Sequence, residues 1–244
     1  MPLEKIEEYI TQFQELPVNL SNRITIDGGE PMLPYFMKNE DYIPGGLLVI
    51  SKAGATPVIK TNGSWGNTYT DRRAILKSLA KNANFSGRPV TLNMPVDEFH
   101  ENIPGVANII ADIVFSNYLS DAIYIELCGF STIGSVVAIA RMRSDLKSKD
   151  INTLDLINEN LVAYNEDGGR IHIVTDYTSG IKPFGRAIKN HTDTADNLTT
   201  YVNKVHIDND DNVTLNHVVR DRINNRPLAK VMEGLIKNTD ARQR

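Results

Sequence analysis

The stretch Asp121–Arg143, DAIYIELCGFSTIGSVVAIARMR, is the least polar part of the chain, and the interpretation of the rest depends on it. Apolar residues alternate with polar or small ones from Ile123 to Leu127, which is typical of a strand with one buried face. Beyond the glycine-bearing turn, Val136 and Ile139 have helical spacing, while Val137 and Ile139 equally fit a returning strand. The stretch is therefore either a strand, a turn and a helix, or a β-hairpin.

The composition is that of a soluble globular protein. A chain of 244 residues can bury a sizeable core, and 41% hydrophobic and 23% charged residues are ordinary fractions. The net charge of −4 argues against binding nucleic acid through overall charge. The single cysteine, Cys128, excludes an intrachain disulfide framework and any zinc site built on several cysteines.

No segment is predicted to direct the chain to a membrane or to export. The N-terminal MPLEKIEEYITQF is a charged amphipathic pattern without the apolar core of a secretory signal. The apolar run Ala122–Ala140 contains Glu126, whose burial in lipid costs about 2.5 to 3.5 kcal/mol. We therefore expect a soluble, cytoplasmic protein with no membrane partner.

Strand and helix patterns alternate through the middle of the chain, which indicates βαβ units and a largely parallel sheet. We expect one α/β domain, with a mainly parallel sheet flanked by helices at 61–203. An irregular N-terminal segment at 1–60 precedes it, and a C-terminal β-hairpin plus helix at 204–244 follows. Strands are predicted at 47–51, 57–60, 88–94, 122–127 and 170–176, helices at 3–16, 70–83, 103–119, 151–162, within 185–203 and at 227–237, and a hairpin at 204–219.

Two predicted strand ends have the composition of a phosphate site. Ligands of open α/β sheets bind beyond the carboxyl ends of the strands. Here Cys128–Gly134 and Tyr177–Gly180 both combine glycine with small hydroxyl residues. Such turns expose backbone N–H and hydroxyl donors, and a helix beginning behind them adds the positive end of its dipole. Neither the P-loop pattern nor G-x-G-x-x-G after a strand is present.

These two segments also resemble a known family. DAIYIELCGFSTIGSVVAIA resembles the first strand, pyrophosphate loop and following helix of type I phosphoribosyltransferases, and GGRIHIVTDYTSGIKPFGRAI resembles their phosphoribosyl-pyrophosphate loop. The resemblance implies that Asp176 contacts the ribose hydroxyls and that Gly129 faces the pyrophosphate, with Mg²⁺ bridging the ligand oxygens. Thr175 stands where the family has the first of two adjacent acids, so a non-catalytic relative fits the pattern as well.

The candidate site follows from the two turns together. Asp176 is the candidate catalytic residue, and no metal ligand is assigned to the chain itself. The candidate ligand-binding residues are Gly129, Ser131, Thr132, Gly134, Thr178, Ser179 and Gly180.

Two further features carry open interpretations. Asp97, Glu98, His100 and Glu101 form an acid-rich loop past a third strand end, which is either a general-base or metal cluster or a solvated loop. Cys128 is interpreted as a small buried residue rather than a nucleophile, because no sequence feature pairs it with a histidine.

Two functions remain open at this point. In the first, the protein binds a phosphorylated sugar or nucleotide at the strand-end turns, as a transferase or as a non-catalytic relative. In the second, it is a non-enzymatic assembly or interaction protein, such as a virion or host-interaction component, with a hairpin tail suited to strand pairing. We expect a homo-oligomer that binds a phosphorylated small molecule rather than nucleic acid.

Overall fold

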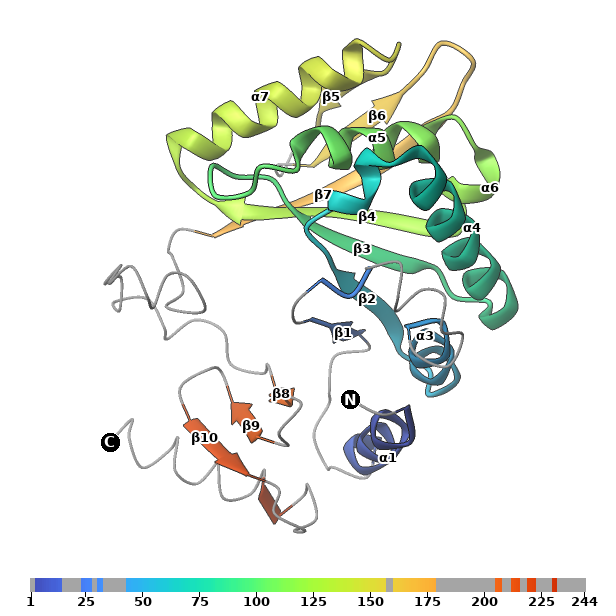
Figure 1. Ribbon diagram of the computed structural model, residues 1–244, viewed down its shortest axis with the longest axis vertical. Coiled ribbons are helices and arrows are strands. Elements are labelled where there is room, and N and C mark those ends of the chain that lie inside the picture. The colour runs from blue at the N-terminus through green and yellow to red at the C-terminus, as the bar shows by residue number, and fades with distance from the viewer. Residues whose placement is uncertain are drawn as a thin grey trace. The chain divides into compact units, whose positions relative to one another are not determined.

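The computed structural model describes residues 3–14, 23–27, 30–32, 43–156, 160–178, 205–207, 212–215, 219–222 and 230–231. They belong to two compact units (Figure 1). The sheet unit comprises residues 22–180, and the second unit comprises residues 1–21 and 181–244.

The sheet unit alternates strands and helices over most of its length, as the sequence pattern indicates. Its elements in chain order are β1 (Arg23–Ile26), α3 (Ile43–Lys52), β2 (Thr56–Lys60), η1 (Ser64–Asn67), α4 (Tyr69–Ser86), β3 (Val90–Pro95), α5 (Ile103–Val114), α6 (Asn117–Ser120), β4 (Ile123–Phe130), α7 (Ile133–Lys147), β5 (Asn152–Asp155), β6 (Leu161–Tyr164) and β7 (Arg170–Thr178).

Seven strands form one sheet in the order β1-β2-β3-β4-β7-β6-β5. The pairs from β1 to β4 are parallel, and so is the pair of β4 with β7. Only the β5–β6–β7 side is antiparallel. The expected α/β fold with a mainly parallel sheet is confirmed.

The helices of this unit form one layer on one face of the sheet. Each strand from β1 to β4 adds to the same side of the one before it, so right-handed crossovers place the connecting helices on a single face. Accordingly α3 packs on α4, and α5 packs on α7 (Figure 1). We call the opposite side the helix-free face, since no described helix of the sheet unit packs there.

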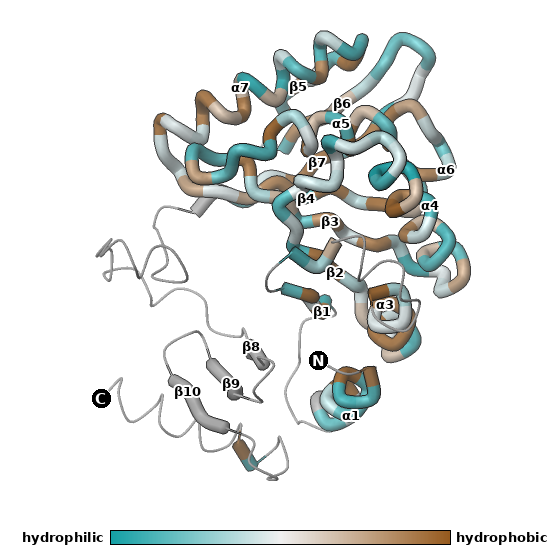
Figure 2. The backbone as a smooth tube through the Cα atoms, viewed as in Figure 1, coloured by the Kyte–Doolittle hydropathy of each residue, from teal (hydrophilic) through white to brown (hydrophobic). Residues whose placement is uncertain are grey.

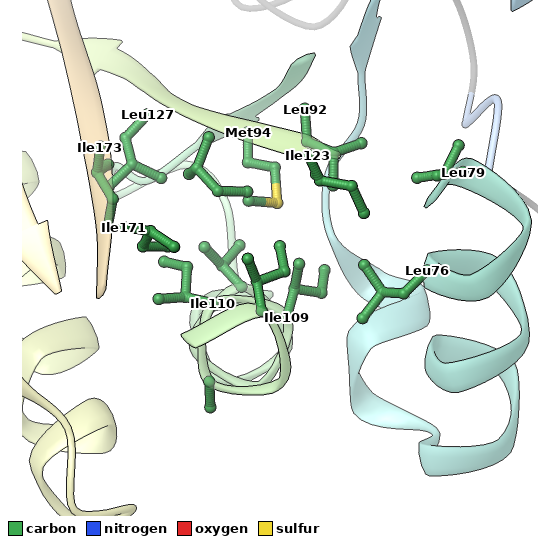
Figure 3. Packing of buried hydrophobic residues seen from close by; sticks show 14 of the residues in the cluster. Leu76, Leu79, Leu92, Met94, Ile109, Ile110, Ile123, Leu127, Ile171 and Ile173 are labelled. Carbon is green, nitrogen blue, oxygen red and sulfur yellow. The ribbon is translucent and has the colours of Figure 1, made fainter. Parts of the chain in front are cut away.

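Alternation along the strands separates a core face from the helix-free face. On β4, Ile123, Ile125 and Leu127 are buried under the helices, whereas Tyr124 on the opposite face is exposed. Figure 3 shows Ile123 and Leu127 on the side of the sheet that faces α5, from which Ile109 and Ile110 project. Removal of this apolar surface from water is the main source of the unit's stability.

The structure settles the two interpretations of residues 121–143. They form a strand, a turn and a helix, because α7 follows β4 after two residues. Thr132 is the N-cap of α7, and its hydroxyl accepts a hydrogen bond from the Ser135 N–H at 3.1 Å. The β-hairpin alternative is wrong.

Two predicted elements are also wrong. The strand expected at 47–51 lies in α3, where Leu47 and Ile50 are buried one helical turn apart. The irregular N-terminal segment also contributes β1, which was not predicted from the sequence, to the edge of the sheet. The helix expected at 103–119 stops at Val114, and the short helix α6 follows separately.

The helix expected at 151–162 is replaced by strands. Asp150, the residue before the expected helix, has a φ of 60° in the turn after α7, a left-handed conformation that aspartate tolerates. The chain then forms β5 and β6, which pair antiparallel with Leu154 opposite Val162. Cross-strand pairing therefore overrides the helical spacing of the apolar residues.

The second unit contains α1 (Leu3–Gln14) and a three-stranded antiparallel sheet of β8 (Val205–Ile207), β9 (Asn212–Leu215) and β10 (Val219–Arg222). The pairing of β8 with β9 confirms the expected hairpin. The helix expected within 185–203 lies outside the described residues, as does that at 227–237 except for Lys230 and Val231.

Length and polarity rule out a membrane span among the described helices. None of them combines enough residues with enough apolar character to cross a bilayer.

Two leucines of the same sheet give a matched test of the core. Leu92 is fully buried on β3, and Leu154 on β5 is 55% exposed. We expect Leu92→Ala to lower the free energy of unfolding by about 2 to 5 kcal/mol and Leu154→Ala by less than about 1 kcal/mol. Urea titration followed by the emission of Trp65, the only tryptophan and a buried residue of this unit, measures both. Equal losses for the two variants would contradict the assigned core face.

Candidate functional site

The candidate site lies at the carboxyl edge of β3, β4 and β7. These three strands are neighbours and run in the same direction, with Pro95 opposite Cys128 and Cys128 opposite Asp176. Farther along, Phe130 is opposite Thr178. The loops that follow the three strands therefore start side by side, as the strand-end prediction requires.

The loop after β3 is fixed to the end of β4 by an aromatic contact. The rings of Phe99 and Phe130 meet edge to face, with centroids 5.6 Å apart. This contact brings Glu98, the residue before Phe99, close to the turn that precedes α7. A glutamate far away in the sequence thus enters the candidate site.

The Glu98 carboxylate binds the first turn of α7. Thr132 Oγ1 lies 2.7 and 2.8 Å from its two oxygens, and the Ser135 hydroxyl donates to Oε2 at 3.0 Å. Gly134 is required beneath it, because a Cβ there would lie 2.6 to 2.9 Å from three Glu98 side-chain carbons. A carboxylate of the chain itself therefore binds two side-chain hydroxyls in the first turn of α7.

These contacts favour the charged form of Glu98. Partial burial by itself would raise the pKa of this carboxyl, but hydrogen bonds from Thr132, its own backbone and Ser135 together hold the pKa below its ordinary value. The stabilisation is therefore present above the pKa of the unfolded chain and is lost as the pH falls through the folded pKa.

An oriented imidazole lies in the same loop. His100 Nδ1 is 2.7 Å from Asp97 Oδ1, and the same oxygen accepts the Phe99 N–H at 2.9 Å. The Asp97 side chain is only 1% exposed, whereas the His100 side chain is 37% exposed. A buried carboxylate bound to Nδ1 orients the ring and directs Nε2 away from it, so His100 can accept or donate a proton there.

A polar row crosses the helix-free face just before the strand ends. Lys60, Asn93 and Glu126 are aligned in register on β2, β3 and β4. Asn93 Nδ2 donates to Glu126 Oε2 at 3.2 Å, and the Arg23 guanidinium donates to Glu126 Oε1 at 2.6 Å. The presence of Glu126 in the apolar run 122–140 argued against a membrane span. In the fold its carboxylate has hydrogen-bond partners on neighbouring strands.

Cys128 lies two residues beyond Glu126 on the same face of β4 and is half-buried. Its Sγ lies 3.1 Å from Asn93 Oδ1. Burial raises the pKa of Cys128 to about 11, with Asp97, Asp176 and Glu126 adding to the rise and Lys60 opposing it. The geometry agrees with the interpretation of Cys128 as a structural residue, since the thiolate is the nucleophilic form.

The structure brings together part of the predicted site. Thr132 and Gly134 lie beside Glu98, and Ser131 is exposed in the same turn. Gly129, near the end of β4, is opposite Tyr177 in the pairing with β7. The first predicted turn is therefore assembled, with a carboxylate in its centre.

The second predicted turn is described only up to its first residues. Asp176 is exposed and shares the helix-free face with its register partner Cys128. The backbone of Thr178 ends β7, while Ser179 and Gly180 lie outside the described residues. A ligand that contacts both Asp176 and the start of α7 would pass over the end of β4.

Two contacts in the site were not predicted from the sequence. Glu98 and Asp97 were recognised only as members of an acid-rich loop, without their partners. The contact of Glu98 with Thr132 depends on β3 lying next to β4, and no local pattern encodes that adjacency. The spacing of Asp97 and His100 is a local signal, and it could have identified their pairing.

Comparison with known proteins adds no assignment to this geometry. No protein-family model matches the chain, and no curated protein matches it. In the part of the chain that the structure describes, no three His, Cys, Asp or Glu side chains are grouped so as to hold a metal ion.

The contact between Thr132 and Glu98 can be tested by titration. Thr132→Val removes the hydroxyl that binds the carboxylate, so we expect the pKa of Glu98 to rise toward its ordinary value. Asp155, whose pKa is lowered by its hydrogen bond with Arg143, should titrate unchanged and serves as an internal control. NMR titration of the side-chain carboxyl carbons measures both, and an unmoved Glu98 pKa would show that the hydroxyl does not bind it.

The burial of Cys128 can be tested by alkylation. Raising the thiol pKa from 9.0 to about 11 reduces the thiolate fraction at pH 8 by about a hundredfold. We therefore expect iodoacetamide to modify the folded protein at least about a hundredfold more slowly than the urea-unfolded chain. Because the chain has one cysteine, mass spectrometry reads the rate directly. Similar rates in both states would refute the assigned burial.

Proposed function

We propose that the carboxyl edge of β3, β4 and β7 binds a phosphorylated sugar or a nucleotide, with a phosphate group at the N-terminus of α7. The observation that supports this most directly is the Glu98 carboxylate, which the Thr132 and Ser135 hydroxyls bind at that position. A position that binds one oxyanion through hydroxyl donors has the chemistry to bind another.

A phosphate group can replace this carboxylate. Glu98 is an exposed side chain, so it can turn into solvent without leaving a buried charge behind. A phosphate carries more charge and more acceptor oxygens than a carboxylate, and the first N–H groups of a helix need acceptors. In this proposal Glu98 competes with the ligand and leaves when the ligand binds.

The sugar would lie over the ends of β4 and β7. Asp176 is exposed there and can accept hydrogen bonds from sugar hydroxyls, which is the role that the phosphoribosyltransferase resemblance implies for it. We propose that Mg²⁺ enters bound to the phosphate oxygens of the ligand. The cation would also offset the repulsion between the phosphate and the carboxylates of Glu98 and Asp176.

Ligand-induced thermal stabilisation tests this proposal. We expect phosphoribosyl pyrophosphate or ribose 5-phosphate, each with Mg²⁺, to raise the melting temperature, since a ligand at a hundred times its Kd stabilises by about 2.7 kcal/mol. Thr132→Val and Asp176→Ala each remove a group that contacts the ligand. We expect each variant to bind the ligand at least tenfold more weakly, so its melting temperature should rise less at the same ligand concentration.

Two further variants sharpen the test. Asp121→Ala removes an exposed carboxylate just before β4, at the opposite edge of the sheet, and should leave the rise intact. Glu98→Gln weakens the internal competitor and should increase the ligand affinity. No rise with either ligand in the wild type, or an equal loss in Asp121→Ala and Asp176→Ala, would overturn the proposal.

A further inference from the structure

The antiparallel side of the sheet ends in the strand β5. Within the described part of the chain, β5 pairs with β6 only, so its other side is an edge of the sheet. Helix α7 lies beside this strand and contacts it (Figure 1). An edge strand offers a row of backbone N–H and C=O groups to another strand. The outer side of β5 is therefore a place where an extended chain can be added.

The register of β5 shows which backbone groups are available. The Leu156 N–H donates to the Asn160 carbonyl at 2.7 Å, so these residues continue the β5–β6 register as a hydrogen-bonded pair. Such pairs alternate along antiparallel strands, so Leu154 also bonds toward β6. The N–H and C=O groups of Thr153 and Asp155, on either side of it, are directed outward. They have no backbone partner among the described residues.

A polar pocket lies between β5 and the last turns of α7. Its volume is about 340 Å³, and its lining residues are Arg143, Ser144, Lys147, Ile151, Asn152 and Thr153. None of the described residues of β6 lines it, so the pocket adjoins the outer edge of β5 rather than the interior of the sheet. The hydrophilic colour accordingly recurs along the last turns of α7 in Figure 2.

The pocket contains cationic donors that lack acceptors. The Lys147 ammonium group belongs to no ion pair among the described residues. The terminal nitrogens of Arg143 bind Asp155, but its Nε atom is buried without an acceptor in the described part of the chain. A buried donor without an acceptor is rare in a folded protein and calls for a partner. The pocket therefore has the charge and the donors to bind a carboxylate.

We propose that an extended acidic peptide of a partner protein pairs antiparallel with the outer edge of β5 and places one carboxylate in this pocket. Thr153 and Asp155 lie on the face of the sheet that α7 covers, because Asp155 binds Arg143 and Thr153 lines the pocket. A peptide residue opposite Thr153 has its side chain on that same face, so an aspartate or glutamate there reaches Lys147. The residue opposite Asp155 must not be acidic, because like charges directly opposite are destabilising.

Leu154 adds a second requirement for the peptide. Its side chain is 55% exposed and projects from the helix-free face. The peptide residue opposite Leu154 projects from the same face, where an apolar side chain would cover it. Because the strands are antiparallel, the peptide that fits β5 has, from N to C, a non-acidic, an apolar and an acidic residue.

Two independent features select this occupant. The outward backbone groups of Thr153 and Asp155 require a strand, because only an extended backbone matches their spacing. The donors of Arg143 and Lys147 require an acid on that strand. The inference does not depend on the ligand proposed above.

Selection from a library of random eight-residue peptides on the purified full chain tests the proposal. We expect the selected peptides to contain the three-residue pattern. Lys147→Glu should weaken the binding of a synthesised selected peptide at least tenfold, because it places like charges in the pocket. The matched control is Lys77→Glu, which changes an exposed lysine on α4 and should leave the affinity unchanged. Fluorescence anisotropy of the labelled peptide measures both affinities. No selected peptide, selected peptides without an acidic residue, or equal affinities of the two variants would overturn the proposal.

Hydrogen exchange tests the strand pairing. At saturation, the selected peptide should slow the exchange of the Thr153 and Asp155 amides at least tenfold. The Leu154 amide, which already bonds toward β6, should exchange as before. Unchanged exchange of the two outward amides would refute the pairing. So would protection that grows with protein concentration in the absence of peptide, which is the result that pairing between two copies of the chain would give.

A proline variant separates the outward backbone groups from the fold. Thr153→Pro removes one outward N–H and leaves the hydrogen bonds to β6 in place, so we expect it to weaken peptide binding at least tenfold. Circular dichroism and Trp65 emission verify that the variant is folded. If it is not, Lys147→Glu and the exchange measurement still decide the question. A folded Thr153→Pro variant with wild-type affinity would contradict the pairing.

Discussion

The parallel pairing of β4 with β7 is the constraint on which the rest of the sheet unit depends. Two adjacent parallel strands cannot be joined by a tight turn, so the chain must travel back along the sheet before the second strand begins. Here α7 makes that return and β5 and β6 extend the sheet on the far side of β7. The N-terminus of α7 therefore lies where β4 and β7 end, together with the loop that follows β3.

This arrangement explains why donors and acids gather at one edge. The parallel strands present their carboxyl ends together, and the next helix starts there with N–H groups that need acceptors. Thr132 caps one of these N–H groups, and Glu98, from the loop after β3, accepts hydrogen bonds from the Thr132 and Ser135 hydroxyls. The same geometry thus brings the Glu98 carboxylate to the first turn of α7.

Local patterns in the sequence predicted the parts of the fold that have one dominant period. The strands at 88–94 and 170–176 and the helix at 70–83 were recognised because their apolar residues fit a single spacing. Residues beyond the turn in 121–143 fit both a helical and a strand spacing, so the sequence leaves both structures open. The structure decides between them, because Thr132 there caps the helix α7. Residues 151–162 fit a helix, yet pairing with β7 makes them strands. Asp176 and Thr132 could be selected because strand ends are visible in a sequence, whereas the Glu98 contact needed the strand order.

The strand order also determines when the sheet can be completed during synthesis. Strands β1 to β4 pair with their immediate predecessors, so each can join the sheet as soon as it leaves the ribosome. In contrast, β7 is the last strand of the sheet to be made and must lie between β4 and β6, which are both older. Until residues 170–178 are made, one edge of β4 lacks its partner. The end of β4 that precedes α7 therefore gains its second neighbouring strand only after residues 170–178 are made.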